Sequence, residues 1–257
     1  MLPLYRLRGL IYYVGAVLLI ANALFGAAFS TDIRGIAGVA GLVLIAIAAT
    51  LIFVGPKRLP EHAPREVHAP VRGRWLAANS PASAVPSHGV RMYGQAHAID
   101  LVFDPEGATR PSYGAMNKPQ EYPAFGEPVF AMIDGEVVTA TGWRRDHRTR
   151  STAIAMIYLI IEGGIREIGG PGFILGNHVT IRGADGVFAT VAHLKKGSIK
   201  VKVGDQVTTT TQLANCGNSG NSTEPHVHAQ LMDRRSPWTG QGLPIADLPK
   251  NGEYLTA

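Results

Sequence analysis

Two stretches without a charged residue lie close together near the start of the sequence, Gly9 to Ser30 and Gly35 to Gly55. Each is long enough, at about 20 residues, to cross the hydrocarbon core of a bilayer as an α-helix. A soluble helix of this length normally keeps a polar face, and neither stretch has one. A cleaved signal peptide fits the first stretch less well, because its apolar core is long and a second apolar stretch follows at once. We therefore expect residues 1–55 to form a transmembrane helical hairpin with a tight loop at Thr31 to Arg34.

Proline is frequent just after the second stretch, at positions 56, 60, 64 and 70. Proline at this density favours an extended and semi-rigid spacer. We expect a linker over residues 56–70, followed by a globular domain over residues 71–257.

The pattern of the globular part is that of short strands separated by turns. Residues 129–133 and 136–140 flank Asp134-Gly135, a dipeptide typical of tight hairpin turns. Further short strands are indicated over residues 177–182, 187–194 and 198–207. Because no long amphipathic helix is evident after residue 71, we expect an all-β domain, built as a sandwich or a barrel.

A basic run, Arg144 to Arg150, and the apolar, glycine-rich stretch after it interrupt this pattern. We interpret residues 143–175 as an insertion, a loop or flap containing one helical turn or a β-hairpin. His147 lies within the basic run, where we expect it to be solvated.

Charge and cysteine content narrow the class of protein. The formal net charge is +5 and the pI is near 9.4, which suits an anionic partner such as a membrane or a cell-wall polymer. No dense basic run with interleaved aromatic residues points to nucleic acid, so we expect no nucleic-acid partner. The single cysteine, Cys216, excludes an intrachain disulfide, and we expect it to be a small packed residue.

The most specific motif is Gly217 to His228, Gly-Asn-Ser-Gly-Asn-Ser-Thr-Glu-Pro-His-Val-His. The residues that follow favour an extended chain, and side chains two apart in a strand share a face. His226 and His228 should therefore project into one site, where paired imidazoles form a ready chelate for zinc. A bare histidine pair would more simply be bonded to nearby carbonyls, but the long turn before it favours a metal site.

This string resembles the final block of the lysostaphin/LytM family of zinc endopeptidases, which cut peptide cross-bridges of peptidoglycan. Supporting segments are Gly126-Glu127-Pro128-Val129, Gly176-Asn177-His178-Val179 and Ala192-His193-Leu194, and the resemblance runs over roughly residues 85–232. It implies a β-sandwich with a long groove, one Zn²⁺ ion, water-mediated hydrolysis of an amide bond and a peptidoglycan peptide as substrate.

The resemblance also implies a ligand set, from which this sequence departs at one position. The family's ligands are a histidine, an aspartate four residues later and the second histidine of His-x-His. His228 and Asp100 match, but the position four before Asp100 is Ala96. His97 is three before Asp100 and would face away from it in a regular strand, unless a bulge intervenes.

A second substitute for the missing histidine is His88. It lies in Ser87-His88-Gly89, upstream of the strand that carries Asp100, and could return beside that carboxylate from a neighbouring strand or loop. The Ser-His-Gly string also looks like a divergent branch of the family. We favour His88, Asp100 and His228 as the metal ligands, with His97 as the alternative to His88.

His193 and His226 match the family's catalytic positions that do not bind the metal. One would accept the proton of the attacking water, and both could hydrogen-bond the oxyanion. The function implied is that of a membrane-anchored zinc metalloendopeptidase acting on peptidoglycan cross-links. Ala96 motivates an alternative, a zinc-free relative that binds and regulates cell-wall hydrolases. Such a binding module would have no need of the retained residues, which are Asp100, His193, His226 and His228.

The charges flanking the apolar stretches conflict with this substrate. Basic residues lie outside both ends of the expected hairpin: Arg6 and Arg8 before it, and Lys57, Arg58 and Arg65 after it. The positive-inside rule therefore favours both ends in the cytoplasm. Peptidoglycan lies outside the cytoplasmic membrane, and we give the expected substrate more weight than the flanking charges. We expect a cell-membrane protein with two spans and its catalytic domain on the outer side.

Overall fold

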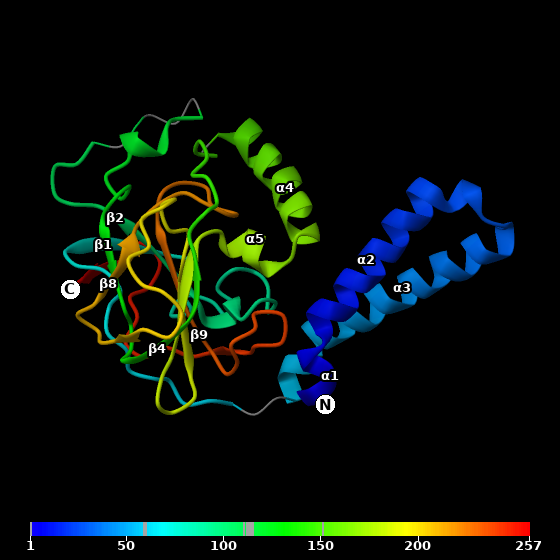
Figure 1. The fold of residues 1–257 in the computed structure, drawn as a ribbon, viewed down its shortest axis with the longest axis horizontal. Helices are drawn as coiled ribbons and strands as arrows, with labels where there is room; N and C mark the ends of the chain where they lie inside the picture. Colours follow the sequence, from blue (N-terminus) through cyan, green and yellow to red (C-terminus); the bar gives the residue numbers. More distant parts are fainter. Residues whose placement is uncertain (1, 59–60, 110, 112–115, 151) are drawn as a thin grey trace.

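The computed structural model of the chain describes residues 2–58, 61–109, 111, 116–150 and 152–257. Its N-terminal part is a pair of antiparallel helices that projects from one side of a globular domain (Figure 1). A short helix, α1 (Leu2–Arg6), precedes α2 (Arg8–Phe25) and α3 (Thr31–Phe53). By length and composition, the segments Arg8–Ala28 and Thr31–Phe53 could each cross a membrane.

The chain reverses between α2 and α3 earlier than the sequence indicated. A 3-10 turn, Gly26–Ala28, follows α2, and the expected loop residues Thr31 to Arg34 already belong to α3. Ser30 caps α3, because its side chain accepts a hydrogen bond from the backbone N–H of Ile33. Asp32 lies in the first helical turn, where a negative charge is favourable.

The domain is built on one large antiparallel sheet with the strand order β11-β1-β2-β9-β6-β5-β4-β7. A further strand, β10, pairs with the C-terminal end of β9. The strands are β1 (Arg74–Ala78), β2 (Ile99–Phe103), β4 (Gly135–Thr141), β5 (His178–Arg182), β6 (Phe188–Ala192), β7 (Gln206–Val207), β9 (Val227–Met232), β10 (Gly242–Leu243) and β11 (Tyr254–Thr256). A second sheet holds β3 (Pro128–Phe130) and β8 (Gln212–Asn215). The globular domain is therefore mostly β.

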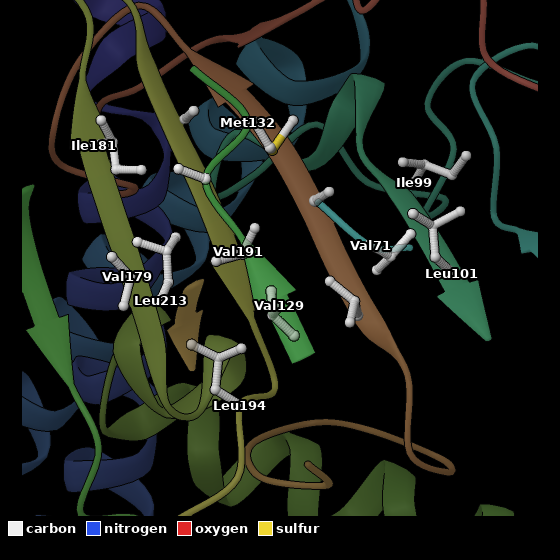
Figure 2. Packing of buried hydrophobic residues seen from close by; sticks show 14 of the residues in the cluster. Val71, Ile99, Leu101, Val129, Met132, Val179, Ile181, Val191, Leu194 and Leu213 are labelled. Atoms are coloured by element: carbon white, nitrogen blue, oxygen red, sulfur yellow. The ribbon is translucent and has the colours of Figure 1, made fainter. Parts of the chain in front are cut away.

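The hydrophobic core lies between the large sheet and the small one. Val129 of β3 and Leu213 of β8 pack with Val179, Ile181 and Val191 of the large sheet (Figure 2). All five side chains are at most 2% exposed, so the small sheet closes the core. Burial of this kind is worth roughly 1.5–3 kcal/mol for each large aliphatic side chain. The core thereby fixes the strands that carry the site.

Two expectations about strand pairing have different outcomes. The segments 177–182 and 187–194 do pair, with Val179 opposite Val191. The hairpin around Asp134-Gly135 is wrong, because β3 pairs with β8 while β4 pairs with β5 and β7. The turn at Asp134 therefore connects the two sheets, since β3 belongs to the small sheet and β4 to the large one. The Asp134 carboxylate accepts the backbone N–H of Thr209. Of residues 198–207, only Gln206–Val207 form a strand.

The insertion contains a full helix, which corrects the expectation of an all-β domain with a loop at residues 143–175. Helix α4 spans Ala153–Ile168, and α5 spans Pro171–Leu175. The Thr152 hydroxyl caps α4 by accepting the N–H of Ala155. The isoleucines of this segment favour a strand by propensity, but its alanine, leucine, methionine, glutamate and arginine favour a helix.

The chain between the hairpin and β1 runs along the domain. Arg65 forms a parallel bridge with Ile245, and its backbone N–H donates to Pro244 at 3.0 Å. The N–H of His68 donates to the carbonyl of Met132 at 2.9 Å. Backbone contacts with the domain therefore begin before Val71, within the proline-rich segment.

Candidate metal centre and active site

Three neighbouring strands, β2, β9 and β6, bring the candidate residues together. Asp100 in β2 lies opposite His228 in β9, and Ala192 at the end of β6 lies opposite the same histidine. Directly opposite residues of antiparallel strands point to one face, and His226 joins them because it is two residues before His228. The pairing register thus gathers the carboxylate and both histidines of the His-x-His motif.

His193 reaches this site through a change of backbone conformation. Ala192 shares a face with His228, so a regular continuation of β6 would turn His193 away. Instead, β6 ends at Ala192 and His193 has a left-handed backbone with φ of 60°. Its ring centroid lies 4.7 Å from that of His226 and 5.6 Å from that of His228. Left-handed conformations are uncommon outside glycine and concentrate at functional sites.

The expected ligand atoms lie close together. His88 Nε2 is 3.1 Å from Asp100 Oδ2, and His228 Nδ1 is 2.9 Å from Asp100 Oδ1. One donor atom from each of these three residues falls within 4.8 Å of the other two. His97 lies elsewhere, lining a cavity of about 500 Å³ beside the base of the hairpin together with Tyr5. The structure therefore places His88, and not His97, beside the carboxylate.

Both histidines of this set are oriented by a further hydrogen bond. The Nδ1–H of His88 donates to Ser87 Oγ at 3.0 Å, which turns Nε2 toward Asp100. The Nε2–H of His228 donates to Gln230 Oε1 at 2.8 Å, which turns Nδ1 toward the same carboxylate. Such bonds fix the tautomer and the ring orientation of metal-binding histidines.

Asn79 and Gln230 complete this outer layer. Asn79 Nδ2 donates to Asp100 Oδ2 at 2.7 Å. The amide of Gln230 is held because its Nε2 donates to the carbonyl of Tyr93 at 3.0 Å. Neither residue was predicted from the sequence to take part in the site. Gln230 could have been found, since it is two residues after His228 on the same strand face, whereas nothing local marks Asn79.

The two remaining histidines also present oriented rings. The Nδ1–H of His193 donates to the carbonyl of Ser219 at 2.8 Å, and that of His226 donates to the carbonyl of Glu224 at 2.7 Å. Their Nε2 atoms are thereby left for other partners. His226 Nε2 lies 3.5 Å from Asp100 Oδ1, so it borders the candidate metal centre.

Burial and mutual contact shift the pKa values of the site in different directions. Burial lowers the pKa of His226, but Asp100 outweighs burial and raises it above its usual value. Burial raises the pKa of Asp100, but His88, His226 and His228 outweigh burial and hold it well below its usual range. Burial lowers the pKa of His228, and burial with its neighbouring histidines lowers the pKa of His193 well below the usual range. An ionised carboxylate with neutral imidazoles is the state in which these groups bind a metal ion.

The insertion supports the loop between β8 and β9. His147 is buried, with Nδ1 and Nε2 both 2.9 Å from carbonyl oxygens, those of Arg148 and Gly220 respectively, so the expectation of a solvated ring is wrong. The Asp146 carboxylate accepts the backbone N–H groups of Asn218 and Lys196. These contacts hold the segment that supplies the Ser219 carbonyl to His193. Cys216, at the start of this segment, is a buried core residue, as expected.

An antiparallel sheet and a loop that together gather two histidines and a carboxylate, with two further histidines beside them, define a metallopeptidase type of site. Residues 120–239 match the model of Peptidase family M23. The match covers slightly less than half of the chain, and it confirms the resemblance to zinc metallopeptidases of the lysostaphin/LytM type. His193, His226 and His228 lie within the matched segment. His88 and Asp100 lie before it in sequence, and the fold brings them to the same site.

Similar solved structures include lysostaphin of Staphylococcus simulans, which is 22% identical over 56% of this chain and 40% of that chain, with a TM-score of 0.34. The catalytic domain of lysostaphin is 20% identical over 66% of this chain and 88% of that chain, with a TM-score of 0.35. The catalytic domain of the prophage-encoded M23 protein EnpA from Enterococcus faecalis is 23% identical over 56% of this chain and 86% of that chain, with a TM-score of 0.31. This chain thus spans less than half of the first lysostaphin chain.

Proposed function

We propose that this chain is a membrane-anchored zinc metalloendopeptidase that hydrolyses peptide bonds in the cross-links of peptidoglycan. One observation carries the proposal: donor atoms of His88, Asp100 and His228 converge, and each of these side chains is oriented by another residue. The match of residues 120–239 to Peptidase family M23 supports a peptide substrate of this kind.

The donor set fits zinc by its chemistry. Two imidazole nitrogens and one carboxylate oxygen are donors that zinc prefers, and three protein ligands leave a position open for catalysis. A zinc ion held by His88 Nε2, Asp100 and His228 Nδ1 would supply Lewis acidity, which polarises the scissile carbonyl and acidifies water. The side chain of Asp100 is 9% exposed and that of His228 is 3% exposed, so solvent screens this centre little.

His193 and His226 are the residues we assign to proton transfer. Because the Nδ1–H of each ring donates to a backbone carbonyl, Nε2 faces the site with its lone pair. One of them would accept a proton from the attacking water, and the ring protonated in this way would donate a hydrogen bond to the developing oxyanion. General base catalysis of this kind typically contributes about 10²- to 10⁴-fold in rate.

The membrane anchor in this proposal is the α2–α3 hairpin. The helices approach closely at Gly15 and Gly41, where an added Cβ would lie 3.0 Å from Leu44 and 2.7 Å from Leu19 respectively. Small residues at such contacts are typical of helices packed within membranes. Large apolar side chains on the outside of the pair, such as Ile36 and Val39, are exposed. These features support two spans with both ends on one side.

The catalytic domain is proposed to lie on the outer side of the membrane. Two of the basic residues that favour the opposite placement, Arg6 and Arg8, have partners within the domain. Arg6 pairs with Asp233 at 3.0 Å, and buried Arg8 donates to the carbonyls of Arg91 and Gly240. These contacts offer a reason for the two charges that is independent of membrane topology. A C-terminal alkaline phosphatase fusion should be active, and an inactive fusion of normal abundance would reverse the placement.

The test of the enzyme is metal content and hydrolysis measured on the same preparation. The full chain in detergent should hold about one zinc per molecule, as the ligand set requires. It should release new amino groups from purified peptidoglycan, and chelation should abolish that release. A folded chain that binds no zinc and cleaves no peptidoglycan would instead support the zinc-free regulator that Ala96 suggests.

A further inference from the structure

Helix α4 turns its charged side chains inward. Glu162 pairs with Arg150 at 2.9 Å and with Arg166 at 3.4 Å, and the side chains of Glu162 and Arg166 are only 15% and 17% exposed. Ala155 and Leu159 complete the buried stripe. A helix on the surface of a soluble domain normally buries its apolar side and exposes its charges. The amphipathic pattern of α4 is therefore inverted.

The opposite face of α4 is apolar and open. Six isoleucines of this helix are between 50% and 79% exposed: Ile154, Ile157, Ile160, Ile161, Ile165 and Ile168. Soluble monomers rarely expose a continuous apolar patch of this kind, and such patches mark sites of interaction. We call these six side chains the isoleucine face.

The isoleucine face continues into the surface of α2. The Tyr13 hydroxyl donates to the carbonyl of Ile168 at 2.7 Å. A cavity of about 330 Å³ lies between side chains from Tyr12 to Ile20 of α2 and from Ile161 to Ile168 of α4. Figure 1 shows α4 on the side of the domain that faces the hairpin. An apolar medium around the hairpin would therefore reach α4 as well.

Basic and aromatic groups border the isoleucine face. Arg144 and Arg145 line a cavity of about 410 Å³ together with Tyr158 and Ile165 of α4. The Arg144 guanidinium lies 4.5 Å from the ring centre of Trp143, which is 63% exposed. Its Nε and Nη1 atoms are buried without a hydrogen-bond partner among the described residues. Guanidinium donors match phosphate, and tryptophan with arginine is typical of the interface between lipid and water.

We propose that α4 lies in the membrane interface, with the isoleucine face in the acyl region and Arg144 on the phosphate of an anionic headgroup. This inference rests on the membrane anchoring proposed above, because the hairpin supplies the bilayer beside α4. Continuity with α2 and the basic border favour lipid over a second copy of the chain or a partner helix. The domain is then held against the membrane surface by two separate contacts.

Depth measurements on the full chain in nanodiscs test this proposal. Single spin labels at Ile157→Cys and Ile160→Cys report on α4, Val39→Cys reports on the hairpin, and Thr256→Cys reports on exposed β11; native Cys216 is buried and stays unlabelled. Collisions with oxygen should exceed those with a water-soluble nickel chelate several-fold at Ile157, Ile160 and Val39. The reverse is expected at Thr256, near the C-terminus that Figure 1 places opposite the hairpin.

The possible failures are distinguishable. Labels at Ile157 and Ile160 that behave like Thr256, with Val39 still in lipid, overturn the role of α4 and leave the anchor intact. Exposure of Val39 to the nickel chelate overturns the anchor and this inference together. Labels on α4 shielded from both reagents reveal a protein occupant, which also overturns the lipid contact.

The headgroup contact has its own test. Raising the share of phosphatidylglycerol over phosphatidylcholine in the nanodisc should move the label at Ile157 deeper, because anionic lipid attracts the basic border. Arg144→Gln should remove most of this response. Lys250→Gln, at an exposed position, is the charge-matched control and should leave it unchanged. An Arg144→Gln variant with the full response overturns the assigned headgroup contact.

Discussion

The Nε2 atom of His88 lies 3.1 Å from Oδ2 of Asp100, although the histidine is in a loop and the aspartate is in strand β2. A histidine four residues before the aspartate is the usual family pattern, and this chain has Ala96 there. The loop that contains Ser87 and His88 returns to the strand, because the N–H of Ser87 donates to the carbonyl of Ala96 at 3.1 Å. A ring from the loop thereby faces the carboxylate that the missing side chain would have faced.

His88→Ala should reduce bound zinc from about one ion per chain to a small fraction, because a two-ligand site holds zinc weakly. Hydrolysis of peptidoglycan should be lost with it. His97→Ala is the matched control, and it should keep both the metal and the activity. Elemental analysis of the purified full chain measures the occupancy. A His88→Ala protein that still holds a full equivalent of zinc would remove His88 from the ligand set.

Ser87→Ala should weaken zinc binding by about 10- to 100-fold, because the outer partner that orients a metal-binding histidine is lost. The Ser87 hydroxyl accepts the Nδ1–H of His88 and donates to the carbonyl of Ala98 at 2.7 Å. Ser87→Thr retains the hydroxyl and should restore most of the affinity. Competition with a fluorescent zinc chelator gives the dissociation constants. Equal affinity in the alanine variant and the wild type would show that the loop orients His88 without this bond.

His193→Ala should retain zinc and lose about 10²- to 10⁴-fold in turnover, the usual contribution of a general base. The ring of His193 lies beside His226, but none of its atoms belongs to the candidate metal cluster. Zinc content and rate are therefore measured on one preparation. His228→Ala provides the contrast, since it should lose metal and rate together. Unchanged turnover in His193→Ala would exclude this residue from catalysis.

The sequence was informative wherever a local pattern determines the structure. His228 is in β9 and His226 directly precedes that strand, so their common face follows from the two-residue period of an extended chain. The same rule would have indicated Gln230. The partnership of Asn79 with Asp100 depends on the pairing of β1 with β2, which no local signal specifies.

The insertion shows why its structure was harder to predict. Residues 153–168 were not recognised as a helix, because an amphipathic helix is normally identified by an apolar stripe alternating with a charged side. In α4 the apolar side is the broad one, and Glu162 and Arg166 occupy the narrow buried stripe. His147 was expected in water because four arginines surround it in sequence, yet the fold buries it against Gly220.

Acid should weaken the fold through His178 of β5. This ring is 8% exposed, its Nδ1–H donates to the carbonyl of Gly176 at 2.9 Å, and burial lowers its pKa below 6.5. The unfolded chain, with a histidine pKa of about 6.5, therefore takes up this proton first as the pH falls. Stability from the neutral ring is complete above about pH 6.5 and decreases below it, by at most about 1.4 kcal/mol per pH unit, until the folded ring is also protonated.

His178→Asn should therefore flatten the loss of stability below about pH 6.5, because asparagine keeps a donor near the Gly176 carbonyl but does not titrate. The measurement is the free energy of unfolding of the full chain in detergent as a function of pH. The difference between variant and wild type isolates His178 from the other histidines. His68→Asn, at an exposed position, is the control and should follow the wild-type curve. If the two variants gave the same pH dependence, burial of His178 would not be the source of the acid sensitivity.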